Sequence, residues 1–255
     1  MRAQAPAKVN IFLKITGLRG NYHELRSRFV RIDSLCDTLS FESKSTPSKR
    51  FELLSDTPLP QKNTVTEAYR LLKEKAPKIE SFFHTHRVRL IKRIPQGAGL
   101  GGGSSDAAAF LKLCNDVCDL KLSLETLAKI GEKIGADVPF FVYGYPAANV
   151  EGIGEIITPF EEEPPTLTLY TPDIHCDTTA VYRSFRQHCI DILDPDAGDN
   201  WLRIPSTELL HTLDPLQAND LYPAALKIYP ELAKKGKPGW FFSGSGSTFF
   251  QMSDE

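Results

Sequence analysis

The feature that most constrains this chain is a glycine-rich segment at residues 95–109, in which four of the five residues from Gly99 to Gly103 are glycine. Glycine adopts positive φ angles and lets the backbone approach a ligand closely, because no Cβ stands in the way. Three alanines follow at 107–109, and the stretch 106–120 places its apolar residues near one stripe, which predicts a helix. The sequence therefore predicts a glycine loop that leads directly into a helix.

A loop of this kind is suited to binding an anion such as a triphosphate. The first N–H groups of a helix have no partner within the helix and carry a partial positive charge. We expect Ser104 and Ser105 to cap the helix. The segment lacks the Gly-Lys-Ser/Thr ending of a Walker A loop and the acidic residue of a Rossmann fingerprint. A tight turn with no ligand is the alternative, and the density of glycines before two serines makes it the weaker one.

Composition and charge exclude several classes of protein. The chain has 255 residues, of which 41% are hydrophobic and 24% charged, as is ordinary for a globular protein. A formal net charge of −2 argues against a nucleic-acid-binding protein. No apolar run approaches the roughly 18 residues of a membrane-spanning helix. The first residues lack the apolar core of a signal peptide, so we expect a cytoplasmic protein.

The cysteines indicate reduced thiols rather than a disulfide framework. There are five, an odd number at irregular spacing. Cys114 and Cys118 can face the same way on a helix, but a structural zinc ion normally takes four protein ligands. Core packing is therefore the favoured interpretation of this pair.

Strands and helices alternate along the chain. Strands are expected at 7–16, ended by Gly17 to Gly20, within 28–42, at 86–94 and near 166–171, with two short strands flanking a turn in 240–250. Thr64 and Glu67 form a capping box for a helix that runs to about Lys75. Ser123 is expected to cap a helix that runs to about Ile134. Further helices are expected from Asp177 or Thr178, near 206–212 and within 219–235.

Asp137 is the only charged residue in the run 135–144. An acid beside such an apolar run is either a turn or cap residue or a functional carboxylate, and the sequence favours neither. A polar break at 161–165, Glu-Glu-Glu-Pro-Pro, suggests a domain boundary near residues 150–165.

Three motifs resemble those of the GHMP kinases, a family named for galactokinase, homoserine kinase, mevalonate kinase and phosphomevalonate kinase. They occur in the family's order and are Pro6-Ala-Lys-Val-Asn10, Gly97-Ala-Gly-Leu-Gly-Gly-Gly-Ser-Ser-Asp106 and Gly244-Ser-Gly-Ser247. The resemblance implies an α+β fold of two lobes with the active site in the cleft between the lobes. It also implies an N-terminal ATP-binding lobe at 1–150 and a C-terminal substrate-binding lobe at 151–255.

Further segments at 16–25, 135–139 and 151–155 resemble the family members that phosphorylate an alcohol bearing a cytidine diphosphate group, in the non-mevalonate synthesis of isoprenoid precursors. Two departures stand out. Gly20-Asn21 replaces an Asp-Gly pair with one residue fewer, and the chain stops soon after the last motif. A terminal helix and strand that are common in the family are therefore expected to be missing or replaced.

The resemblance implies a set of site residues, with ATP and Mg²⁺ as cofactors. Asp137 is expected to act as the base and Lys8 as its partner, although Lys8 taken alone would be an exposed strand lysine. The residues expected to bind ATP are Pro95, Gln96, Gly97, Ala98, Gly99, Leu100, Gly101, Gly102, Gly103, Ser104 and Ser105. Those expected to bind the substrate are Asn10, Tyr22, His23, Phe29, Thr178 and Tyr182.

Residue type supports part of this assignment. The ring of Tyr22 can stack on a pyrimidine, and His23 can offer a directional hydrogen bond. The metal ligands are not identified, and Ser105 is only a candidate. We expect a monomer or a weak homodimer.

Two other functions stay open at this point. Another GHMP kinase, of the homoserine or mevalonate type, would keep the glycine loop but should lack the Tyr22-His23 pair. A nucleotide-binding regulator without turnover would lack the acid or the lysine, and this chain has both.

Overall fold

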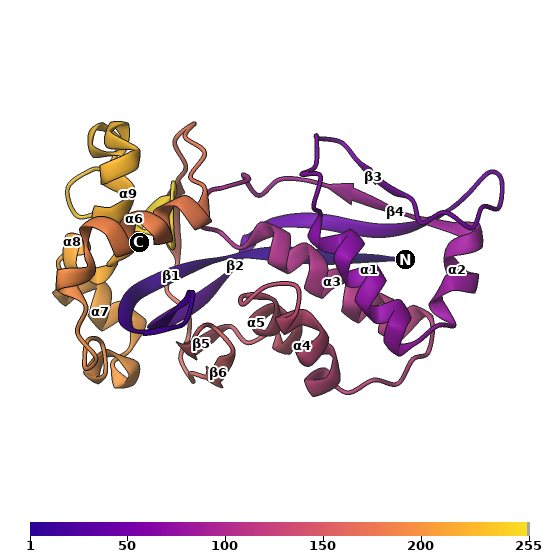
Figure 1. Cartoon of the computed structure of the whole chain (residues 1–255), viewed down its shortest axis with the longest axis horizontal. Coiled ribbons are helices and arrows are strands. Elements are labelled where there is room, and N and C mark those ends of the chain that lie inside the picture. The colour runs from indigo at the N-terminus through magenta and orange to yellow at the C-terminus, as the bar shows by residue number, and fades with distance from the viewer. Residues whose placement is uncertain (254–255) are drawn as a thin grey trace. The chain divides into compact units, whose positions relative to one another are not determined.

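The computed structural model describes residues 1–253, which form two compact units (Figure 1). The first unit consists of Met1–Ala7, Ile32–Ile94 and Gly101–Gly144, and the second of Lys8–Arg31, Pro95–Leu100 and, within the described residues, 145–253. Two long strands, β1 (Arg2–Arg19) and β2 (Tyr22–Ser43), contribute residues to both units. The expected ATP-binding and substrate-binding lobes stay a prediction, because compactness alone does not say what a unit binds.

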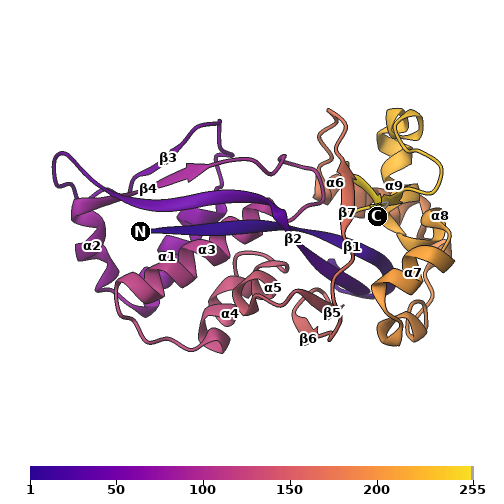
Figure 2. The same ribbon diagram turned by 180° about the vertical axis from the view of Figure 1, so that it is seen from behind.

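The first unit packs helices against part of a six-stranded sheet. Its strands are β3 (Leu53–Ser55), β4 (His86–Ile91) and parts of β1 and β2; β1 pairs with β2, and β4 runs antiparallel to β2 and parallel to β3. Its helices are α1 (Thr64–Lys75), α2 (Ile79–Thr85), α3 (Gly102–Val117), α4 (Leu124–Glu132) and α5 (Val138–Tyr143). Figures 1 and 2 show α1 beside α3, and these helices are in contact. The core includes an aromatic cluster of Phe41, Phe51, Tyr69, Phe83 and Phe110.

The second unit contains the rest of the six-stranded sheet and a second sheet of three strands. In the first, β5 (Ala147–Gly152) lies antiparallel to both β2 and β6 (Ile156–Pro159). The other has the order β7 (Leu167–Tyr170), β9 (Phe249–Met252), β8 (Phe241–Phe242). Its helices are α6 (Thr178–His188), α7 (Ser206–Thr212), α8 (Pro215–Ala218) and α9 (Leu221–Ile228), with 3-10 turns η1 (Ile190–Ile192), η2 (Asn200–Arg203) and η3 (Pro230–Lys234). Helix α6 packs on α9.

Most of the predicted elements are confirmed, with three corrections of local detail. The first strand begins at Arg2 and ends at Arg19, well beyond 7–16. The cap of α1 is Asn63, whose side chain accepts from the N–H groups of Val65 and Thr66, so Thr64 is not the cap. Strand β4 ends at Ile91 rather than at 94, because aspartate side chains take the next three N–H groups.

Ser123 caps α4 as predicted, accepting a hydrogen bond from the N–H group of Thr126. The short helix α2 was not predicted. In the part of the chain that the structure describes, no helix combines the length and the apolar character needed to cross a membrane.

Candidate active site

The glycine loop has the backbone conformation that its composition predicts. Gly97, Gly99 and Gly101 have φ angles of 65°, 73° and 69°, in the left-handed region that glycine adopts without strain. Gly101 occupies the N-cap position of α3 and provides no side chain for capping. Ser104 and Ser105 are therefore not caps; they lie inside the first turn, because the glycines allow the helix to begin at Gly102.

Four consecutive carbonyl groups of the loop accept hydrogen bonds from elsewhere in the second unit. The donors are Cys176 N to Gly97 O (3.0 Å), Thr248 N to Ala98 O (3.1 Å), Ser243 Oγ to Gly99 O (3.0 Å) and Lys8 N to Leu100 O (3.0 Å). In a trans peptide the N–H group points opposite to the carbonyl. The N–H groups of the same peptides, on residues 98–101, thus point away from these donors. Successive N–H groups in such a turn form a concave site for an anion.

Lys8 is buried on β1, with 4% of its surface exposed, so it is not the exposed strand lysine that its position alone suggests. Its Nζ donates to Asn10 Oδ1 (2.6 Å) and lies 4.4 Å from the ring centroid of Phe29. Asn10 in turn donates through Nδ2 to Ser27 Oγ (2.9 Å). Asn10 and Ser27 thus fix the position of a buried ammonium group.

Asp137 stands at the N-cap position of α5, yet its side chain makes no capping hydrogen bond. The side chain is half-buried. The cap interpretation is therefore not supported, and the functional role of Asp137 stays a prediction. Asp137 belongs to the first unit and Lys8 to the second, and their partnership stays a prediction.

His23 is buried in the second unit against α6, while its neighbour Tyr22 is 63% exposed. Arg186 Nε donates to His23 Nε2 (3.2 Å), so the neutral ring carries its proton on Nδ1. Burial, and secondarily the charge of Arg186, lowers the pKa of His23 to about 4. The ring of Tyr182 lies 4.9 Å from that of His23.

The remaining predicted substrate residues have protein neighbours in the same unit. Phe29 is buried beneath the ammonium group of Lys8. Thr178, the first residue of α6, shares a hydrogen bond with Ser245 (Oγ1 to Oγ, 2.9 Å). The Gly-Ser-Gly-Ser turn therefore contacts both α6 and, through Ser243, the glycine loop.

Sequence reasoning missed Arg186. Besides His23, its guanidinium binds the carbonyl oxygens of Gly20 (2.8 Å) and Tyr22 (3.1 Å), so it holds the turn that carries Tyr22. No motif marks an arginine that is 163 residues away from its partner. It also missed a buried ion cluster in the first unit, formed by Asp37, Lys92 and Asp106.

The cysteines pack as thiols. Cys114 is fully buried in α3, and burial raises its pKa well above the ordinary value, with the nearby Cys118 adding to this. Within residues 1–253, no three His, Cys, Asp or Glu side chains are grouped so as to hold a metal ion.

Comparison with known proteins identifies the family. Residues 63–145 match the family model described as the GHMP kinases N terminal domain. The 4-diphosphocytidyl-2-C-methyl-D-erythritol kinase of Sulfurovum sp. (strain NBC37-1) is 52% identical over 251 residues, which are 98% of each chain. The enzyme of the same name from Sulfurimonas denitrificans is 45% identical over 99% of this chain and 97% of its own.

Solved structures agree with the sequence matches. A crystal structure of 4-(cytidine 5'-diphospho)-2C-methyl-D-erythritol kinase superposes with a TM-score of 0.76 at 32% identity, covering 100% of this chain and 90% of that one. A mevalonate kinase structure superposes with a TM-score of 0.64 at 14% identity, covering 100% of this chain and 91% of that one, which shows a shared fold. With the glycine loop and the α+β architecture in place, the chain belongs to the 4-diphosphocytidyl-2-C-methyl-D-erythritol kinase family of the GHMP kinases.

Proposed function

We propose that this chain transfers the γ-phosphoryl group of ATP to the 2-hydroxyl of 4-diphosphocytidyl-2-C-methyl-D-erythritol, a step of non-mevalonate isoprenoid precursor synthesis. The observation that carries the proposal is 52% identity over almost the whole of both chains to a kinase of that name. The buried Lys8 and the half-buried Asp137 are consistent with it, because an ammonium group and a carboxylate are groups that phosphoryl transfer to an alcohol can use.

The glycine loop is the proposed phosphate site. The N–H groups on residues 98–101 point away from the donors that bind the loop carbonyls, and α3 adds the positive end of its dipole. Residues 95–105 together supply the backbone of this site. The loop side chains contribute little, since most of them are hydrogen atoms or methyl groups.

We expect Gly99→Ala to weaken ATP binding by about tenfold or more, which corresponds to about 1.4 kcal/mol. A Cβ on Gly99 would overlap the backbone carbonyl oxygen of Ser243, which cannot move without disturbing the turn at 243–247. Calorimetric titration with a non-hydrolysable ATP analogue measures the change. Gly239→Ala is the matched control, because Gly239 has a φ angle of 78° but nothing lies within 4 Å of the place that an added Cβ would take. Equal ATP affinity in both variants would show that the loop does not bind the phosphates.

Mg²⁺ is proposed as the second cofactor. Ser105 lies in the first turn of α3, and its buried Oγ has no hydrogen-bond partner in residues 1–253. A hydroxyl oxygen beside bound phosphates suits Mg²⁺, which prefers oxygen ligands and shares them with substrate phosphates. Ser105 is therefore the candidate protein ligand. The ion would neutralise charge on the phosphate oxygens.

Asp137 and Lys8 are the proposed catalytic residues. A tertiary alcohol is hindered and weakly acidic, so it must be positioned in line with the γ-phosphoryl group and lose its proton as the new bond forms. Asp137 takes that proton. Lys8, held by Asn10, offsets negative charge that develops on the transferred phosphoryl oxygens.

Tyr22, His23 and Tyr182 are proposed to bind the cytidine end of the substrate. Tyr22 has an exposed ring available for stacking, and the neutral His23 is fixed by Arg186 and packs on Tyr182. Asn10, Phe29 and Thr178 are secondary members of the pocket, and two of them act by holding Lys8.

Tyr22→Ala is expected to raise the KM for the cytidine substrate by about tenfold, because stacking on an aromatic ring contributes about 1–3 kcal/mol per base. The KM for ATP should stay unchanged, and steady-state kinetics with each substrate varied in turn separate the two effects. A rise confined to the KM for ATP would remove Tyr22 from the cytidine pocket.

One assay tests the function as a whole. ADP formation is followed in a coupled assay with ATP and, in turn, the cytidine substrate, mevalonate, homoserine or no alcohol. We expect turnover with the cytidine substrate alone. Turnover with mevalonate or homoserine would indicate another kinase of the family, and ATP binding without any turnover would indicate a regulator. The cytoplasmic location of the chain and its state as a monomer or weak homodimer stay predictions.

A further inference from the structure

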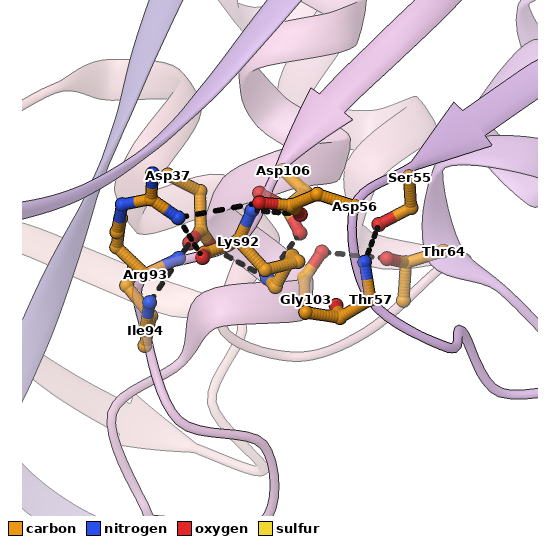
Figure 3. A network of polar contacts seen from close by, with 10 residues as sticks. All are labelled: Asp37, Ser55, Asp56, Thr57, Thr64, Lys92, Arg93, Ile94, Gly103 and Asp106. Carbon is orange, nitrogen blue, oxygen red and sulfur yellow. Dashed lines mark hydrogen bonds and ion pairs between the residues drawn. The ribbon is translucent and has the colours of Figure 1, made fainter.

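A buried ion cluster lies in the first unit, next to the start of α3 (Figure 3). The Nζ of Lys92 contacts Asp37 Oδ2 and lies 2.6 Å from Asp106 Oδ2. The side chains of Lys92, Asp37 and Asp106 are 7%, 0% and 4% exposed. Such a cluster is costly to desolvate and contributes little net stability compared with apolar packing. Its presence therefore suggests that it holds the neighbouring backbone segments in place.

Asp37 fixes the segment that leads into the glycine loop. Its Oδ1 accepts hydrogen bonds from the N–H groups of Arg93 and Ile94, the latter at 2.8 Å. The preceding N–H group, of Lys92, donates to Asp56 Oδ1 (2.9 Å). Carboxylates therefore bind three successive N–H groups after β4. These hydrogen bonds fix the backbone up to Ile94, where the chain enters the glycine loop.

Asp106 fixes the segment that leaves the loop. It is the fifth residue of α3, and Lys92 bridges it to Asp37. The two segments also touch directly, because a Cβ on Gly102 would lie 2.9 Å from Ile94 Cγ2 and 3.5 Å from Lys92 Nζ. A further hydrogen bond ties α1 to the start of α3, because Thr64 Oγ1 donates to the carbonyl oxygen of Gly103 (2.6 Å).

The charges in the cluster do not cancel. One ammonium group faces two carboxylates, and Asp106 Oδ1 has no hydrogen-bond partner in the described residues. Burial raises the pKa of Asp106, and the charge of Asp37 adds to this while Lys92 opposes it. Removal of Lys92 would leave two buried carboxylates facing each other. Removal of the charge on Asp106 would leave an intact Lys92–Asp37 pair.

We propose that Asp37, Lys92 and Asp106 form a clamp that holds the two ends of the glycine loop together and thereby sets its affinity for the phosphates of ATP. The inference rests on the proposed function, in which this loop binds ATP. The three side chains are positioning residues, since they act through the backbone of the loop. The conformational entropy of the loop is then lost during folding, so that ATP binding does not have to offset that loss.

The decisive variant is Asp106→Asn, which keeps the size of the side chain and the Lys92–Asp37 pair. We expect its dissociation constant for a non-hydrolysable ATP analogue and its KM for ATP to rise by about tenfold. Its kcat at saturating ATP and its KM for the alcohol should stay within about twofold of the unmodified chain. Lys92→Met should show the same selective loss, to a greater extent. Lys73→Met, which breaks the exposed Lys73–Glu80 pair in the same unit, is the control and should change neither constant.

Calorimetric titration and steady-state kinetics on the full chain supply these constants, and thermal unfolding shows whether each variant folds. If Lys92→Met does not fold, Asp106→Asn still decides the question. A folded Asp106→Asn variant that binds the ATP analogue as the unmodified chain does would overturn the clamp. Equal rises in both KM values together with a lower melting temperature would also overturn it, since they indicate general loss of structure. No ATP binding by the unmodified chain would instead refute the proposed function on which the clamp rests.

Discussion

Asp137→Asn should lower kcat by about 10²- to 10⁴-fold, the usual contribution of a positioned general base. An amide keeps the size of the side chain but cannot take the proton of the attacking hydroxyl. ATP affinity should change by no more than a few fold, because the phosphate contacts come from the glycine loop. Single-turnover kinetics and analogue titration measure the two quantities separately.

Asp214→Asn provides a matched control for this variant. Asp214 also stands at the N-cap position of a helix, α8, where its side chain accepts a hydrogen bond from the N–H group of Leu216. Asparagine caps helices as well as aspartate does, so this substitution should leave kcat unchanged. Unchanged kcat in Asp137→Asn would reject Asp137 as the base.

Arg28→Met should lower the free energy of unfolding by about 3–5 kcal/mol, as is typical when one partner of a buried ion pair is removed. The Arg28 side chain is fully buried, lies 3.6 Å from Glu162 Oε1 and stacks 3.3 Å from the ring centroid of Phe160. It also donates to Asn149 Oδ1 (2.6 Å) and to the carbonyl oxygen of Leu202 (3.0 Å). Burial lowers the pKa of Arg28 to about 10, and Glu162 opposes that change.

Urea unfolding followed by circular dichroism measures this loss. Arg70→Met is the control, because Arg70 pairs with Glu67 and Glu74 on the exposed face of α1, where an ion pair contributes about 0.3–0.5 kcal/mol. Similar losses in the two variants would mean that burial of the Arg28 network does not matter to stability.

Local chemistry explains which parts of the structure could be predicted. The glycine loop and α3 follow from residue types within one short segment, and Ser123 needs to reach only the N–H group of Thr126 to cap α4. Thr64 was the wrong cap for an equally local reason. Asn63 stands one position earlier, and asparagine is preferred over threonine at the N-cap.

Long-range pairing explains what could not be predicted. Lys92 meets Asp37 across 55 positions of sequence, and Arg186 meets His23 across 163. Neither pair has a characteristic spacing, because the fold brings the partners together. Asp137 is an intermediate case, since its position suggested a cap or a catalytic role; the missing capping bond removes the first, and the second stays a prediction.

The contact between Arg186 and His23 affects how His23 responds when the pH falls. A histidine with an ordinary pKa gains a proton as the pH falls below 6.5, and its acceptor nitrogen then becomes a donor. With its pKa at about 4, His23 keeps the same pattern of donor and acceptor through that whole range. In the proposed cytidine pocket, this imidazole would therefore present the same donor and acceptor to a base throughout that pH range.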